Sequence, residues 1–545
     1  MAEKVEHFVN GHGEWCQSIG LALSGGGYRA AAFHLGTLDY LETVGLERRI
    51  RKISTVSGGT FTGAKYALSQ VEGLSFSQFF NEYYAFLNDT DLLKLGLEKL
   101  ADGRRGVDTG CRKMITAMAQ VYADTFLHKP DGSPYVFGDI MHSDIALADT
   151  VFNATEFRHG LAFRFQRRKN PQAFIGNYKT RISKDDAANI RVADIVAASS
   201  CFPGGFEPIA FPDDFVWPNG QLPETLRQQF ASGPLALMDG GIYDNQGLQS
   251  LLLTDDRESD ADPDLSMFII SDVDQQSDDL YPYPISDKSR GGITLNTLAG
   301  LSVVFIALLT VSLAMLLVNW LTQDFGWYNF FLFALPAALV AAATYALLWL
   351  RARIAVELDR IPMLGRAAWK DIKHLTLDDI EDMISLRISS LFVMAGSVFM
   401  KRVRGLVYGL VYGDFRAPVR KILDELYGKR RISNLIDHLK TGRQFSAELT
   451  KAGVSEPSVE LRKVVDVAAD MRTTLWFDRP DQLPSLVASG QATLCYNLMK
   501  FVVRNFGDDP ADYPDDARDL WWKLNEDWRA FNEAPLFLVE RRLDG

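Results

Sequence analysis

Two long stretches without charge limit how this chain can fold more than any other feature. Residues 291–323 and 325–350 contain no Asp, Glu, Lys or Arg; the first is rich in Leu and Val, and the second in Ala, Leu and Phe. A helix needs about 20 apolar residues to cross the hydrocarbon core of a bilayer, so each stretch is long enough. Only a short turn around Asp324 separates them. We therefore expect a transmembrane helical hairpin over residues 291–350.

The residues around this hairpin predict its orientation. Aromatic side chains, which favour the membrane interface, gather near the turn: Trp320, Trp327 and Tyr328. Basic side chains flank the two outer ends: Lys288, Arg290, Arg351 and Arg353. Because the turn has no Lys or Arg, the positive-inside bias predicts two spans with both outer ends in the cytoplasm. The alternative, a helical hairpin buried in a large soluble core, is disfavoured by two adjacent charge-free stretches with aromatic ends.

A glycine turn near the N-terminus is the first sign of a binding site. A buried strand is expected over residues 19–23, then Ser24-Gly25-Gly26-Gly27, then a strong helix pattern. Free N–H groups at a helix start bind anions, either a phosphate or the oxyanion of a tetrahedral intermediate. The dinucleotide fingerprint also fits formally, but the next strand does not end in an acidic residue, and no P-loop Gly-Lys-Ser/Thr follows. The oxyanion interpretation is therefore favoured.

A second turn carries a candidate nucleophile. The strand-like run 53–56, in which all residues but Ser54 are β-branched, leads into Ser57, and Gly58 and Gly59 follow before a helix-compatible segment. A strand that turns sharply into a helix exposes a serine hydroxyl for attack, and glycine after the serine permits the tight turn. A Ser-Gly-Gly turn alone is more often an ordinary loop, so its meaning depends on its surroundings.

A third turn supplies a carboxylate. The short apolar strand 235–238 ends in Asp239-Gly240-Gly241. Asp-Gly turns are common, so this feature also carries little weight alone. Upstream, residues 197–208 have the pattern of a helix end followed by a loop of small residues, proline and glycine.

Together these four features resemble the patatin-like phospholipases, which show the same signatures in the same order. The resemblance covers roughly residues 17–275. It implies a Ser57–Asp239 catalytic dyad without histidine. No cofactor is expected, and the remaining histidines show no metal-ligand spacing, so no metal site is expected either. The resemblance also implies an oxyanion hole and supporting positions: Gly25, Gly26 and Gly27 for the oxyanion, with Arg29, Gly58, Gly59, Gly240 and Gly241 in support.

One residue departs from the family pattern. The family usually shows G-x-S-x-G around the nucleophile, and Thr55 stands where its first glycine would be. A β-branched residue is stiff, which makes a strained turn two residues later less favourable. We expect a variant of the usual turn at Ser57.

The expected fold class is α/β, with a three-layer core around a mostly parallel sheet. We expect three parts: a catalytic domain over residues 1–290, the hairpin over 291–350, and a mainly helical C-terminal region over 351–545. For the apolar stretch 391–400 in that region, two interpretations stay open. It completes the catalytic domain as a buried helix, which is favoured, or it lies on the membrane surface.

The function expected from these features is membrane-associated lipid acyl hydrolysis of the phospholipase A or lysophospholipase type, through an acyl-enzyme. Membrane phospholipids or lysophospholipids would be the substrates, and the net charge of −12 argues against nucleic acid as a partner. Two alternatives stay open: a non-catalytic membrane scaffold or sensor, and a Ser-Asp-His esterase or protease using His374 or His438. The sequence also leaves open self-association through the hairpin and regulation by a partner.

Overall fold

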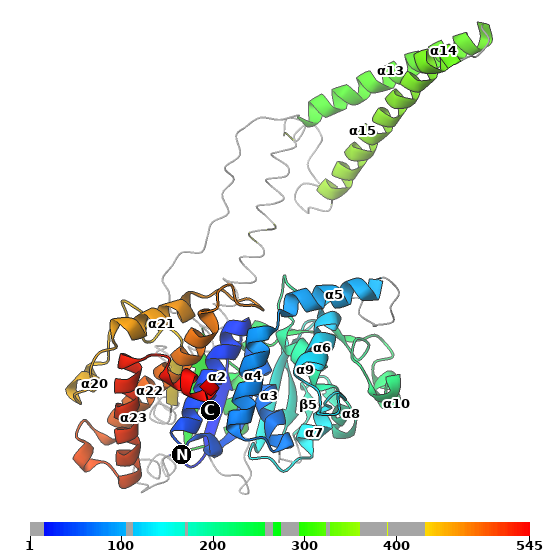
Figure 1. Ribbon diagram of the computed structural model, residues 1–545. Helices are drawn as coiled ribbons and strands as arrows, with labels where there is room; N and C mark the ends of the chain where they lie inside the picture. The colour runs from blue at the N-terminus through cyan, green and yellow to red at the C-terminus, as the bar shows by residue number, and fades with distance from the viewer. Residues whose placement is uncertain are drawn as a thin grey trace, which may run out of the picture. The chain divides into compact units, whose positions relative to one another are not determined.

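The computed structural model describes most of the chain (Figure 1). The described residues are 16–104, 113–168, 173–256, 265–273, 294–322, 327–359 and 431–544, with Thr376, Ile388 and Ser390. They belong to two compact units: Met1–Asp279 together with Ala395–Gly545, and Leu280–Met394. Residues 431–544 therefore lie in the same unit as residues 16–273, and the two apolar helices lie in the other.

The first unit is built on a mixed sheet. Its strands are β1 (Ile19–Leu23), β2 (Ile50–Val56), β3 (Asp149–Glu156), β4 (Leu161–Arg167), β5 (Ile175–Gly176), β6 (Arg181–Ile182), β7 (Ile209–Phe211), β8 (Leu235–Asp239), β9 (Met267–Asp272) and β10 (Arg431–Leu435). The main order is β10-β9-β1-β2-β3-β4-β5-β6, and β8 pairs with β3 and β7. Strands β10 to β3 are parallel to one another, whereas the pairs beyond β3 are antiparallel.

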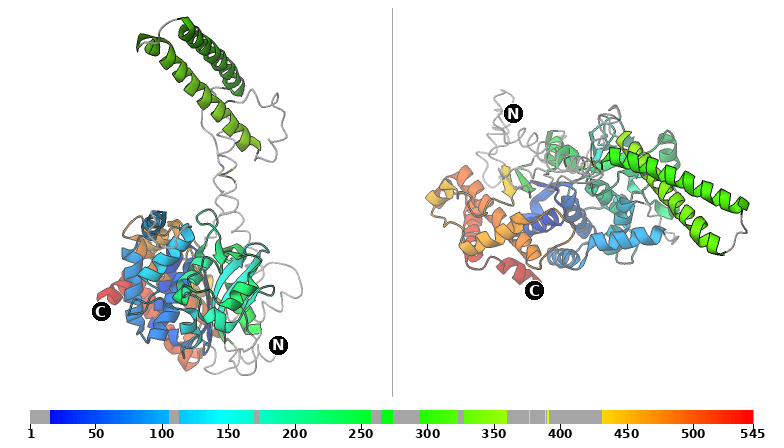
Figure 2. Two further views of the ribbon diagram at one scale, coloured as in Figure 1. Left: turned by 90° about the vertical axis from the view of Figure 1, so that its right-hand side faces the viewer. Right: turned by 90° about the horizontal axis from the view of Figure 1, so that it is seen from above.

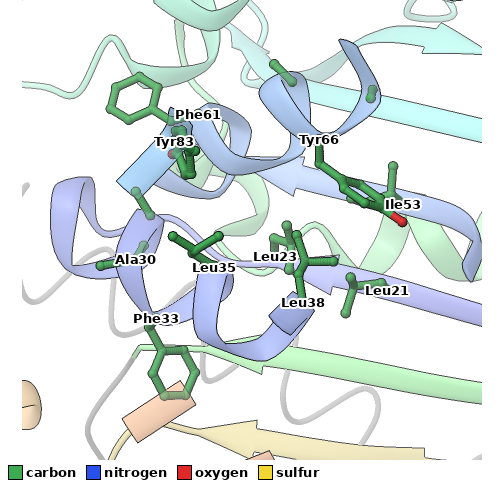
Figure 3. Packing of buried hydrophobic residues seen from close by; sticks show 14 of the residues in the cluster. Leu21, Leu23, Ala30, Phe33, Leu35, Leu38, Ile53, Phe61, Tyr66 and Tyr83 are labelled. Atoms are coloured by element: carbon green, nitrogen blue, oxygen red, sulfur yellow. The ribbon is translucent and has the colours of Figure 1, made fainter. Parts of the chain in front are cut away.

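Helices cover both faces of the parallel part. Alternate residues of a strand point to opposite faces, so β1 divides its side chains between two apolar clusters. Leu21 and Leu23 belong to the large cluster, which α2 and α3 cover, and Ala22 belongs to a small cluster with α12. Figure 3 shows Leu35 and Leu38 of α2 beside Leu21 and Leu23. The predicted three-layer α/β fold is confirmed.

The helices of this unit are α2 (Gly27–Thr43), α3 (Gly58–Glu72), α4 (Phe76–Asp89), α5 (Leu92–Arg104), α6 (Met114–Thr125), α7 (Phe137–Met141), α8 (Lys184–Ala188), α9 (Val192–Ser200), α10 (Glu224–Gln229), α11 (Gly241–Asp244), α12 (Leu248–Asp256), α20 (Ala447–Lys451), α21 (Val459–Asp470), α22 (Gln482–Phe506), α23 (Asp515–Glu533) and α24 (Phe537–Asp544). Short 3₁₀ turns occur at Glu47–Arg49, Pro218–Gly220 and Pro510–Asp512.

The C-terminal helices pack on the N-terminal ones. α22 lies along α2, as Figures 1 and 2 show. The two helices touch at glycines: a Cβ on Gly36 would lie 2.0 Å from the carbonyl oxygen of Val487, and one on Gly490 would lie 2.2 Å from that of Phe33. Only glycine permits so close an approach of two helix backbones. α2 is therefore buried between the sheet and the C-terminal region.

The second unit is a helical hairpin. It consists of α13 (Leu295–Thr322), α14 (Trp327–Asn329), a π-helical turn (Phe330–Ala334) and α15 (Leu335–Asp359). Ala299–Thr322 and Phe330–Trp349 are long and apolar enough to cross a membrane, with mean hydropathies of 2.8 and 2.1. Within the described residues, only 6% and 11% of the positions in the apolar 18-residue stretches of these two segments are buried. That exposure differs from a core helix of a soluble protein, which is mostly buried.

Candidate active site

Ser57 occupies a strained turn between β2 and α3. Its backbone has φ 51° and ψ −120°, and it is the only non-glycine residue with positive φ in the described part of the chain. Such a conformation costs about 1–3 kcal/mol and persists only where the surrounding structure imposes it. A serine on a strained strand-to-helix turn is the geometry of a nucleophile elbow.

The glycine turn and the Ser57 turn are in direct contact. A Cβ on Gly25 would lie 3.0 Å from Cβ of Ser57, and one on Gly58 would lie 2.2 Å from the carbonyl oxygen of Gly27. A Cβ on Gly59 would lie 2.4 Å from the carbonyl oxygen of Leu23, the last residue of β1, and 2.7 Å from that of Ser24. The glycines predicted at these turns therefore allow the two backbones to meet beside Ser57.

The N–H groups of the glycine turn are not equivalent. The Gly25 N–H donates to the carbonyl oxygen of Asn245 at 2.9 Å, and the Tyr28 N–H donates to that of Thr474 at 2.9 Å. The Gly25 N–H is therefore not free to bind an oxyanion, because it already donates to the Asn245 carbonyl. For Gly26 and Gly27, no acceptor lies among the described residues. Of the three glycines predicted for the oxyanion hole, only Gly26 and Gly27 remain as candidate donors.

Strand β3 brings Ser57 and Asp239 to one place. β4 pairs with one edge of β3 along its length, so β2 and β8 share the other edge. β2 runs parallel to β3 and pairs Val56 with Asn153, whereas β8 runs antiparallel and pairs Asp239 with Ala154. The carboxyl ends of β2 and β8 therefore meet from opposite directions at two neighbouring residues of β3.

The Asp239 carboxylate is held by the turn that follows it. Oδ1 accepts the N–H of Gly241 at 2.7 Å, and the Asp239 carbonyl accepts the hydroxyl of Thr155 at 2.8 Å. A Cβ on Gly240 would lie 2.4 Å from the carbonyl oxygen of Asn153, so glycine is needed there. Asp239 is only 3% exposed, which favours hydrogen bonding over solvation of its carboxylate.

Comparison with known proteins identifies the domain. Residues 21–252 match the family model described as patatin-like phospholipase. The chain carries a patatin-like phospholipase domain. Among solved structures, human GIVD cytosolic phospholipase A2 matches with 14% identity and a TM-score of 0.30, over 49% of this chain and 47% of that one. VipD from Legionella pneumophila matches with 11% identity and a TM-score of 0.24, over 97% and 92%. No curated protein sequence matches the chain.

Within the patatin-like domain, Thr55 is accommodated by a glycine on the next helix. A Cβ on Gly63 would lie 2.4 Å from Cγ2 of Thr55, so Gly63 provides the space that the threonine methyl occupies. The Thr55 hydroxyl lies 2.9 Å from that of Thr60. The extra side chain at position 55 thus fits the elbow because α3 lacks one at position 63.

This fit predicts a coupled pair. Gly63→Ala is expected to destabilise the protein by about 1–3 kcal/mol, because its methyl would overpack against Thr55. Thr55→Ser keeps the hydroxyl and removes Cγ2, so the double variant should unfold at a higher temperature than Gly63→Ala alone. Thermal unfolding of the four members of this cycle measures the coupling. Equal stability of Gly63→Ala with and without Thr55→Ser would contradict the contact.

The C-terminal region reaches the start of α2. Between α21 and α22, the carbonyl oxygen of Met471 accepts Nη1 of Arg29 at 2.9 Å. The Phe477 ring packs on the Tyr28 ring with centroids 5.3 Å apart, and Thr474 accepts the Tyr28 N–H as noted above. Arg29, predicted as a supporting residue, therefore contacts a segment outside the family match. Sequence reasoning missed this segment, which carries no motif.

The histidines do not form a triad with Ser57 in the described structure. His34 donates from Nε2 to the Ser24 carbonyl at 2.9 Å and accepts the Ser271 hydroxyl at Nδ1 at 2.8 Å. Burial lowers the pKa of His34 to about 4, so it is a neutral core residue at pH 7. His438 follows β10, and β9 and β1 lie between β10 and β2, the strand that leads into Ser57. At ~4.8 Å per strand, β10 and β2 are about 14 Å apart, which is too far for a triad contact. His374 lies outside the described residues.

Proposed function

We propose that this protein is a membrane-anchored lipid acyl hydrolase that cleaves acyl esters of phospholipids or lysophospholipids. Ser57 is the nucleophile and Asp239 is its base. The observation that carries the proposal is the meeting of the strained Ser57 turn with Asp239 at neighbouring residues of β3. The patatin-like phospholipase match supports lipid as the substrate class.

The proposed reaction has two halves. Asp239 takes the proton of the Ser57 hydroxyl while its oxygen attacks the acyl carbonyl carbon. The oxyanion of the tetrahedral intermediate accepts hydrogen bonds from the N–H groups of Gly26 and Gly27, at the positive end of α2. The intermediate then expels the glycerol oxygen, which takes the proton from Asp239. Water attacks the acyl-Ser57 ester in the same way and releases the fatty acid.

The hairpin would anchor this activity at a bilayer. We propose that α13 and α15 span the membrane with their outer ends in the cytoplasm, since the basic residues flank only the outer ends. The first unit, Met1–Asp279 with Ala395–Gly545, is called the catalytic unit from here on and would lie in the cytoplasm too. A cysteine introduced at Gly326, in the turn, is expected to react with an impermeant maleimide added to intact cells. Reaction only after lysis would reverse this orientation.

Product analysis tests the activity. The full-length protein in phosphatidylcholine or lysophosphatidylcholine vesicles is expected to release free fatty acid, which lipid mass spectrometry detects. A fluorophosphonate probe is expected to form one adduct, on the peptide that contains Ser57. If neither product nor adduct is found, the result would favour a non-catalytic scaffold. An adduct with turnover of small esters but no lipid product would favour an esterase.

A further inference from the structure

Ser199 lies against the Ser57 turn, and the proposed reaction does not use it. It is the second-last residue of α9 and is fully buried. Its hydroxyl oxygen lies 3.0 Å from the Ser57 amide nitrogen, 2.7 Å from the Asn153 carbonyl oxygen and 2.8 Å from the Thr60 hydroxyl. Ser199 therefore contacts the nucleophile's backbone and β3, the strand whose edge β2 and β8 share.

The direction of each hydrogen bond follows from the chemistry of these groups. A hydroxyl has one hydrogen to donate and two lone pairs that accept. The Asn153 carbonyl can only accept, so the Ser199 hydrogen goes to it, and the Ser57 N–H can only donate. The Thr60 hydroxyl must then donate to Ser199. Its remaining bond, to Thr55 at 2.9 Å, is donated by Thr55.

The result is a one-way chain of hydroxyls from Thr55 through Thr60 and Ser199 to the Asn153 carbonyl. Ser199 makes the full set of one donated and two accepted bonds. Thr55, the residue that departs from the usual G-x-S-x-G pattern, supplies the first hydrogen. Its side chain thus contributes a polar contact to the elbow that glycine could not make.

The backbone of Ser199 holds the other half of the site. Its carbonyl oxygen accepts the N–H of Gly240 at 3.2 Å. The Cys201 carbonyl, two residues further along the chain, accepts the Asp239 N–H at 2.9 Å. The end of α9 therefore binds the Ser57 turn through a side chain and the Asp239 turn through its main chain.

We propose that Ser199 is a positioning residue that keeps the Ser57 nucleophile aligned with Asp239, with Thr60 and Thr55 completing its hydrogen-bond chain. The inference rests on the proposed hydrolase function and deepens it. Without the Ser199 hydroxyl, the Ser57 N–H, the Asn153 carbonyl and the Thr60 hydroxyl lose their shared partner. The positive-φ turn would then shift, and displacement of a reacting atom by about 1 Å can slow an enzyme by about 100-fold.

The test compares two neighbouring serines in the full-length protein. Ser199→Ala removes the shared hydroxyl. Ser200→Ala removes a buried hydroxyl that donates to the Val196 carbonyl and lies beside the Tyr122 hydroxyl, with no bond to Ser57, Thr60 or Asn153 among the described contacts. With a soluble nitrophenyl ester, Ser199→Ala is expected to lower kcat by about 10- to 100-fold with KM nearly unchanged. The second-order rate of fluorophosphonate labelling should fall in parallel. Ser200→Ala should keep kcat close to that of wild type, because it leaves the hydrogen bonds of the Ser199 hydroxyl in place.

Active-site titration separates positioning from simple loss of fold. A positioning role predicts full labelling stoichiometry with a low kcat per labelled site. A merely structural role predicts fewer labelled sites, each with wild-type kcat, and would overturn the proposal. Thr55→Val and Thr60→Val, which keep side-chain shape, provide a second arm if Ser199→Ala folds poorly. Each is expected to lower kcat by a smaller factor, with Thr62→Val on the same helix as the control.

The outcomes distinguish this inference from the proposed function. Active wild type with an equally active Ser199→Ala would overturn only the positioning role. Equal losses in Ser199→Ala and Ser200→Ala would also overturn it. A wild-type protein that neither labels nor hydrolyses esters would overturn both.

Discussion

Ser57→Ala is expected to reduce ester hydrolysis by roughly 10⁴-fold or more while the protein stays folded. Alanine has the same backbone restriction as serine at φ 51°, so the strained turn is retained, and only the attacking oxygen is lost. Turnover of a soluble ester and of phospholipid vesicles measures the loss, and circular dichroism checks the fold. Ser69→Ala, which removes a buried hydroxyl at the far end of α3, is the matched control and should keep activity.

Asp239→Asn is the sharper test of the base. Asparagine keeps an oxygen that can accept the Gly241 N–H, which Oδ1 holds at 2.7 Å, so the turn should persist. Its amide cannot take a proton from Ser57, and the loss of a general base is expected to cost roughly 10²–10⁴-fold in kcat. Asp239→Ala should abolish activity as well, but it also leaves a buried N–H without its acceptor.

Asp244 provides the matched control, because it is a second buried carboxylate five residues along the chain. Burial raises the pKa of Asp244, and its two oxygens accept the N–H groups of Gln246 at 3.1 Å and Gln249 at 2.7 Å. These contacts indicate a structural role. Asp244→Asn is expected to lower stability but to keep kcat per labelled Ser57. If Asp239→Asn retained most of the turnover and Asp244→Asn lost it, the base would be Asp244.

The three glycine-containing turns and the candidate residues on them could be predicted from the sequence, because strand–turn–helix geometry is local. The pattern around Ser57 predicted the elbow, and the patterns around Gly25 and Asp239 predicted two further turns. Their convergence at β3 could not be derived from spacing, since it depends on β8 entering antiparallel beside the end of β2. The family resemblance supplied that association.

Contacts between distant segments were not predictable in the same way. Asn245 takes the Gly25 N–H from a turn some 220 residues away, so no local pattern indicates that Gly25 lacks a free donor. The space for Thr55 is a missing side chain at Gly63, which has no signal of its own. β10 was also missed: a five-residue strand in a region with helical patterns is recognised only by its partner, β9.

Deleting residues 280–394, the whole second unit, is expected to release the protein from membranes without unfolding the catalytic unit. The described core of that unit is complete without the hairpin: β10 pairs with β9, and α22 packs on α2. Residues 274–279 and 395–430 remain as the connection, and at ~3.3 Å per extended residue they easily exceed the length of a strand. The deletion variant should appear in the soluble fraction and hydrolyse a soluble ester with kcat near that of wild type.

Truncation after residue 279 is the contrasting variant, and it is expected to aggregate. It would expose the outer edge of β9, which invites pairing between chains. It would also uncover the face of α2 that packs on α22 at Gly36 and Gly490. Each large apolar side chain contributes about 1.5–3 kcal/mol on burial, so losing the buried apolar side chains of α22 would remove as much as a typical stability of about 5–15 kcal/mol.

Polar contacts add to this dependence on the C-terminus. Asp39 of α2 is fully buried and accepts Nε of Arg542 and Nε2 of Gln491, each at 2.6 Å. Burial raises the pKa of Asp39 to about 6 despite the nearby Arg542 guanidinium, so the carboxylate depends on these partners from α24 and α22. Truncation would remove both.

Sedimentation, size-exclusion chromatography and circular dichroism of the two variants decide whether the catalytic unit needs residues 431–544. A soluble, active truncation at 279 would show that the patatin-like domain folds without the C-terminal helices. A hairpin-deleted variant that still sediments with membranes would show that another part of the chain binds lipid. If instead the deletion variant is soluble and the truncation aggregates, the hairpin is an insertion within one catalytic unit, and the segment at Met471 contacts Arg29 as part of that unit.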